Sequence, residues 1–177
     1  MTRLIAVVAP ALMLVYGLCR YADGLDGDRG NGWAWDAGHV AFFIAVALFA
    51  VLADRLRREL PSPLTVVAEA VTIVGAAGML WVITGDLFDS FPSLPLLLNV
   101  LASVLFEVGL LVLLVRHAVA RRLPAWSPVL VLLGFTSIAL SLDLLPLSAV
   151  LVGAGLLPLA RDGRRLPAVV GERLGSS

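Results

Sequence analysis

The amino-acid sequence predicts an all-α fold, an integral membrane bundle of six transmembrane helices in three hairpins with both termini cytoplasmic. Three observations predict it. The 177 residues are 60% hydrophobic and have a mean hydropathy of +0.98, whereas soluble domains hold roughly 45–50% apolar residues. Long apolar runs recur along the chain. The arginines collect on one side if the number of spans is even.

Four apolar segments are long enough to cross a membrane, which takes roughly twenty helical residues for about 30 Å of hydrocarbon. They cover residues 4–22, 37–53, 64–83 and 94–115. The first follows Met-Thr-Arg, as the apolar part of a targeting segment would, but no convincing small-x-small cleavage site comes after it. We therefore expect this segment to remain as the first span.

The last apolar run, residues 128–160, is too long for one straight helix and contains Asp143 and Pro146. Proline breaks the helical hydrogen-bond ladder and disfavours the α conformation in the residue before it. We therefore expect two short helices, at about residues 128–142 and 145–160. No segment outside the spans is long enough for a second domain, so residues 1–177 form a single membrane domain.

The charged residues test this count, because cytoplasmic loops are enriched in arginine. All thirteen basic residues are arginine. With six spans, only Arg20 and Arg29 fall on the outer side. The cytoplasmic side holds Arg3, Arg55, Arg57, Arg58, Arg116, Arg121, Arg122, Arg161, Arg164, Arg165 and Arg173. The outer side holds Asp23, Asp26, Asp28, Asp36, Asp86, Asp89 and Asp143. Five spans would move the arginines after residue 160 outside, so the pattern favours six.

Composition and motifs exclude several classes of function. The net charge is zero, so no basic field indicates a nucleic-acid partner. His39 and His117 fall on opposite sides of the membrane and cannot ligate one haem together. The sequence has no glycine-rich phosphate loop after a strand, no G-x-S-x-G and no H-E-x-x-H. We predict no cofactor, and the sequence leaves a metal undetermined.

A polar series interrupts the fourth apolar segment. Asn99, Ser103 and Glu107 are spaced four residues apart, so they share one face of a helix. A charged side chain at the bilayer centre is costly, so we expect this face to point into the bundle, with Thr136 and Ser137 adding to a polar interior. Glu107 is then either a proton-handling or ligand-binding carboxyl group, or a polar staple between helices.

A second group of candidates lies at the outer ends of the spans. Asp36 and His39 are three residues apart at the start of the second span, and Asp86 and Asp89 have the same spacing where the third span ends. Asp143 sits at the tip of the last hairpin. Because the helices of this hairpin are short, we expect its tip to lie below the outer headgroups of the membrane, with Asp143 partly buried. One imidazole and several carboxylates suit a divalent metal or acid–base chemistry. Helix caps and solvated loop charges explain the same pattern.

The stretch "DGLDGDRG…GH", residues 23–39, resembles segments of small uncharacterised multi-pass membrane proteins of actinobacteria. The resemblance covers mainly the first hairpin and brings no activity with it. It implies a bacterial plasma membrane, the inner membrane, as the location.

Two classes of function and one simpler alternative follow. The chain binds or transports a proton, a cation or a lipid-like ligand through a polar interior open to the acidic outer rim, with Asn99, Ser103, Glu107, Asp36, His39, Asp86 and Asp89 as ligand-binding candidates. Alternatively, it is an intramembrane enzyme on a lipid or isoprenoid, with Glu107 and Asp143 as general acids, by analogy with membrane-bound terpene cyclases. The simpler alternative is a non-catalytic accessory subunit. A chain of this size is small for a transporter, so we expect a homo-oligomer or a partner membrane subunit in the lipid bilayer.

Overall fold

The computed structural model describes residues 1–26, 30, 32–88 and 90–161, and every regular element within them is a helix. Six α-helices follow one another along the chain: α1 (Thr2–Asp23), α2 (Gly32–Glu59), α3 (Pro63–Leu87), α4 (Leu96–Val119), α5 (Trp126–Leu140) and α6 (Leu145–Arg161). Two short 3-10 helices, η1 (Gly24–Asp26) and η2 (Leu142–Leu144), stand between α1 and α2 and between α5 and α6.

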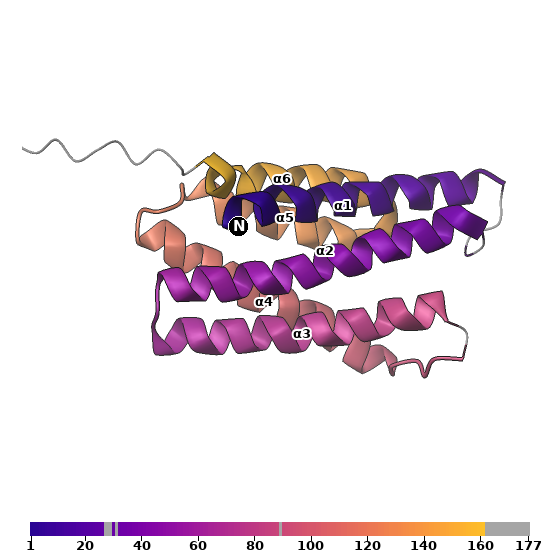
Figure 1. Cartoon of the computed structure of the whole chain (residues 1–177), viewed down its shortest axis with the longest axis horizontal. Helices are drawn as coiled ribbons and strands as arrows, with labels where there is room; N and C mark the ends of the chain where they lie inside the picture. Colours follow the sequence, from indigo (N-terminus) through magenta and orange to yellow (C-terminus); the bar gives the residue numbers. More distant parts are fainter. Residues whose placement is uncertain (27–29, 31, 89, 162–177) are drawn as a thin grey trace, which may run out of the picture.

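The six helices run along a common long axis and alternate in direction (Figure 1). Each helix contacts the next in sequence, and α6 also packs against α1, so the helices form a closed ring. The contact between α4 and α5 is the sparsest in this ring. The all-helical prediction is therefore confirmed.

Five helices in the described part of the chain are long and apolar enough to cross a membrane. α5 is apolar but has only 15 residues, about 22 Å of helix at 1.5 Å per residue. The helix bounds differ from those of the predicted apolar segments. α2, for example, begins at Gly32 and ends at Glu59, because residues 32–36 and the mostly charged residues 54–59 continue the helix past its apolar stretch.

The predicted break in the last apolar run lies where the sequence indicates it. α5 ends at Leu140, and Ser141 adopts an extended conformation with φ −161° and ψ 131°. The Ser141 hydroxyl then accepts a hydrogen bond from the backbone N–H of Asp143, at 3.2 Å. Pro146 stands in the first turn of α6, where its missing N–H breaks no helical hydrogen bond.

α3 begins with a capping box. The Ser62 hydroxyl accepts a hydrogen bond from the backbone N–H of Thr65, and the Thr65 hydroxyl accepts one from the backbone N–H of Ser62, at 3.2 and 2.9 Å. Pro63 occupies the first helical position, which suits its fixed φ. These contacts fix the start of α3 directly after α2.

Small residues bring α3 and α4 into close contact. A Cβ atom on Gly75 would lie 2.2 Å from the Phe106 nitrogen, and one on Gly109 would lie 2.6 Å from the Ala68 carbonyl oxygen. The "GAAG" segment, residues 75–78, is thus a packing surface. Next to it, the rings of Phe49, Phe106 and Phe135 meet edge to face with centroids 5.5–6.0 Å apart. This aromatic cluster fills the middle of the bundle.

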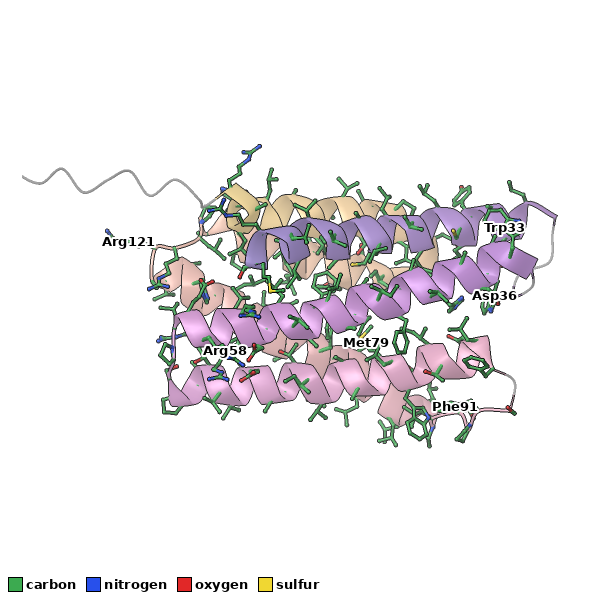
Figure 2. The ribbon with its side chains drawn as sticks, viewed as in Figure 1. Trp33, Asp36, Arg58, Met79, Phe91 and Arg121 are labelled. Carbon is green, nitrogen blue, oxygen red and sulfur yellow. The ribbon has the colours of Figure 1, made fainter. Side chains whose placement is uncertain are left out.

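The two ends of the bundle carry opposite charges. Figure 2 shows Asp36 at one end and Arg58 and Arg121 at the other. We call the first the acidic end, which holds Asp23, Asp36, Asp86 and Asp143. We call the second the arginine end, where α1 begins and α6 finishes. Here Arg57 forms a half-buried ion pair with Glu69 at 2.8 Å, and Arg58 pairs with Asp54 at 2.8 Å.

Candidate functional site

His39 is the centre of a polar cluster at the acidic end. Its side chain is buried, with 3% of its surface exposed. The Nδ1 atom lies 2.9 Å from the carbonyl oxygen of Trp35, one turn earlier in α2. Since a carbonyl only accepts, Nδ1 carries the proton of the neutral imidazole. The unprotonated Nε2 atom is then directed at the neighbouring helices.

Two side chains from α1 and α3 face this Nε2 atom. The Tyr16 hydroxyl lies 3.4 Å away and can donate a hydrogen bond to it. The nearer carboxylate oxygen of Asp86 lies 3.6 Å away. Tyr16 is held in place by Phe42, whose ring stacks on it at a centroid distance of 4.6 Å. A proton taken up by Nε2 would therefore be placed beside a carboxylate.

Trp35 holds α2 and α3 together at this point. Its indole N–H donates a hydrogen bond to the backbone carbonyl of Asp86 at 3.0 Å, and its ring lies against the His39 ring at a centroid distance of 4.0 Å. On the other side, Gly38 lets α1 approach closely, because a Cβ atom there would lie 3.0 Å from the Cβ atom of Cys19. The position of His39 is thus fixed from both neighbouring helices.

Arg20 and Asp23 add charge at the end of α1. Arg20 follows Tyr16 by one turn of α1, and Asp23 is buried with 5% of its surface exposed. One Asp23 carboxylate oxygen accepts a hydrogen bond from the Gly30 N–H at 2.9 Å. The other has no hydrogen-bond partner within the described residues. Asp23 thus fastens the connection between α1 and α2.

The other outer candidates do not join this cluster. Asp36 is exposed near the start of α2 (Figure 2), and Asp89 lies outside the described residues. Asp143 is exposed on the surface of the chain, in η2 between α5 and α6. Among the described residues, no three His, Cys, Asp or Glu side chains are grouped closely enough for a metal.

The series Asn99, Ser103 and Glu107 lies on the outer surface of α4, so the predicted interior position is wrong. Ser103 and Thr136 are exposed, and Asn99 and Glu107 are half-buried. The Thr136 hydroxyl donates to Glu107 Oε1 at 3.3 Å across the sparse α4–α5 contact. We call these four residues the polar stripe. Of the expected polar interior, only Ser137 is buried.

Close packing explains this orientation of α4. The opposite face carries Phe106, Leu110 and Leu113, all buried, together with Ala102 and Gly109, which contact the backbone and small residues of α3. Turning Glu107 inward would separate α3 from α4 and remove the close contacts made by Gly75 and Gly109. Lipid tails are as apolar as leucine, so the loss of this van der Waals packing, rather than the exposure of Phe106, opposes the turn.

The two candidate general acids belong to different elements of the chain. Glu107 lies on α4, and Asp143 lies in η2 after the end of α5. A groove of about 190 Å³ between α1 and α6 is lined by apolar residues and glycine, and includes neither carboxyl group.

A second buried histidine, at the arginine end, repeats the geometry of His39. His117 is fully buried, and its Nδ1 atom lies 2.9 Å from the Leu113 carbonyl, again one turn earlier. Its Nε2 atom has no hydrogen-bond partner within the described residues and lies 3.7 Å from a carboxylate oxygen of Glu59. The Glu59 backbone carbonyl accepts a hydrogen bond from Arg122 at 3.1 Å.

Sequence reasoning missed three of these partners. Tyr16 is separated from His39 by 23 residues, and Glu59 belongs to a different helix from His117. Neither pairing has a spacing that a single sequence reveals. Arg20 gave a weak signal, as one of only two arginines on the acidic side, one turn from Tyr16.

No family model, curated protein or solved structure matches this chain. Its class follows from its own helices, which are those of a membrane-embedded helical protein.

Proposed function

We propose that the chain is a six-span bacterial plasma-membrane protein with the arginine end in the cytoplasm and the acidic end outside. The separation of arginines from aspartates supports this orientation, because positive residues remain in the cytoplasm. A sixth span requires that the short helix α5 crosses the membrane. We infer that η2, which follows α5, completes this crossing. The resemblance of residues 23–39 to actinobacterial membrane proteins supports the bacterial location.

We propose further that the protein binds a proton at each face of the membrane and changes its packing in response. The observation that carries this is the Nε2 atom of the buried His39, which faces both the Tyr16 hydroxyl and the Asp86 carboxylate. A neutral imidazole accepts the Tyr16 hydroxyl hydrogen. An imidazolium would instead donate its new Nε2–H to Asp86 and form an ion pair.

The pair of His117 and Glu59 gives the opposite face the same chemistry. Its Nε2 atom and carboxylate are 3.7 Å apart, and protonation would again create an ion pair between two helices, α4 and α2. The aromatic cluster of Phe49, Phe106 and Phe135 lies between the two histidines and fills the bundle. This packing favours two separate proton-binding sites over a continuous path through one chain.

The chain contains only two histidines, so histidine-selective ¹⁵N labelling reports each site directly. In lipid nanodiscs examined over a range of pH, we expect proton uptake at each site to appear as a change of the imidazole from the Nδ1–H neutral form to the imidazolium. His39→Gln and His117→Gln assign the two signals. Asp86→Asn should alter the His39 signal and leave the His117 signal unchanged, and Asp36→Asn should alter neither. A His39 imidazole that keeps one form across this range would refute the proposal.

A further inference from the structure

We propose that the polar stripe is an interface between two copies of this chain, related by a two-fold axis along the membrane normal. This interface lies on α4 and α5, away from both histidine sites, so the inference does not depend on proton binding. A membrane protein of this size is expected to form an oligomer, and the proposed interface makes a second copy of the chain its partner.

The first step is the exposure of the stripe at membrane depth. Glu107 lies eleven residues after the start of α4, about 16 Å along the helix, too deep for its carboxyl group to reach water from either end. Ser103 and Thr136 are exposed beside it. Val104 and Val108, on the same outer surface, are each about half exposed. A single chain in lipid would leave these polar groups facing hydrocarbon.

The second step is the hydrogen-bonding capacity that the chain leaves unused. Glu107 has one hydrogen bond, a long one of 3.3 Å from Thr136. The Ser103 hydroxyl donates to the Asn99 carbonyl of its own helix. The Asn99 side-chain amide makes no hydrogen bond to any of the described residues. The stripe therefore retains donors and acceptors for a neighbouring helix.

The third step identifies the neighbour as a second copy. An amide, a hydroxyl and a neutral carboxylic acid each both donate and accept hydrogen bonds, so each can pair with its own kind. A two-fold axis along the membrane normal places every residue at the same depth as its copy, so stripe residues close to the axis face their own copies. A different partner would need a matching series of polar groups at those depths.

Cysteine cross-linking tests the interface in purified protein reconstituted at a low ratio of protein to lipid. In a Cys19→Ser background, Ser103→Cys introduces a thiol into the stripe. Val150→Cys is the matched control, since it is exposed on the outer half of α6. We expect a thiol-specific cross-linker to give several-fold more covalent dimer with Ser103→Cys than with Val150→Cys. Equal yields, or a folded Ser103→Cys protein that remains monomeric, would overturn the proposal.

Two further variants separate hydrogen bonding from mere proximity. Replacing Asn99 and Glu107 together by leucine should reduce the Ser103→Cys dimer several-fold, because the self-pairing groups are gone. Glu107→Gln should preserve it, because glutamine still donates and accepts. Undiminished cross-linking in the leucine variant would contradict the polar interface. Repeating the reaction in native membranes identifies the occupant, since an adduct whose mass differs from two copies of the chain would rule out the second copy.

Discussion

The Nε2 atom of His39 lies 3.6 Å from a carboxylate oxygen of Asp86, and the two residues belong to different helices, α2 and α3. A backbone hydrogen bond to Trp35 fixes which imidazole nitrogen faces the carboxylate. The pair therefore becomes an ion pair only when the imidazole takes up a proton. This relationship links proton binding to the packing of two helices.

Asp86→Asn should destabilise the protein in a pH-dependent way. The two groups form an ion pair only when the imidazole carries a proton, so the stabilisation from the pair appears as the pH falls. Because Asp86 is partly exposed, we expect the variant to lose about 0.2–1 kcal/mol at the acidic limit and almost nothing at the alkaline limit. Thermal unfolding of the variant and the wild-type protein in detergent, at an acidic and at an alkaline pH, measures this loss of stability. Asp36→Asn, at an exposed aspartate of the same end, should show no pH-dependent difference.

Tyr16→Phe should keep the fold while removing one hydrogen bond to His39. The ring would still stack on Phe42, so we expect a loss of about 0.5–1.5 kcal/mol in unfolding free energy, against about 3–5 kcal/mol for Tyr16→Ala, which also removes the buried ring. The histidine NMR signals provide the second measurement, in which the His39 signal should shift and the His117 signal should not. Equal losses in the two variants would show that the ring contributes nothing.

Gly75→Ala should separate α3 from α4. The added Cβ would meet the Phe106 backbone nitrogen at 2.2 Å, and backbone cannot rotate away as a side chain can, so we expect at least the 1–3 kcal/mol typical of overpacking. Gly85→Ala is the control in the same helix, because its Cβ would have no atom nearer than 4.0 Å. It should be neutral or stabilising by up to about 1 kcal/mol through helix propensity. Thermal unfolding of the two variants compares them, and similar stabilities would contradict the close contact.

Double-mutant cycles should rank the two ion pairs of the arginine end. Arg57 and Glu69 are 30% and 13% exposed, whereas Arg58 and Asp54 are 61% and 24% exposed, at the same distance of 2.8 Å. The more buried pair is less screened by water, so its coupling energy should exceed that of the second pair. Chemical unfolding of the single and double alanine variants gives both values. The reverse order would contradict the role of burial.

The helices themselves were largely predictable from the sequence. The apolar runs and Asp143 with Pro146 each have a local physical meaning, so they predicted the helices and the break at η2. The ends of α2 were less predictable, because a membrane helix continues after its apolar stretch has finished.

The site was predictable only in part. His39 and Asp86 were both selected from their places at helix ends, but the roles of Tyr16 and of Glu59 depend on contacts between distant segments. The polar stripe was predicted to face inward, because a carboxyl group avoids lipid. In the folded chain, Phe106 and the glycine contacts determine which face of α4 packs inside. The choice between the two faces depends on how α4 fits against α3 in three dimensions.

The most direct test of proton binding at two separate faces changes the pH on one side of the membrane at a time. The protein is inserted in one orientation in vesicles, with histidine-selective ¹⁵N labels and an impermeant buffer. We predict that acidifying the solution at the acidic end converts only the His39 signal to the imidazolium form, and acidifying the arginine end converts only the His117 signal. Conversion of both signals from one side, without leakage of the vesicles, would contradict separate sites and indicate a proton path through the bundle.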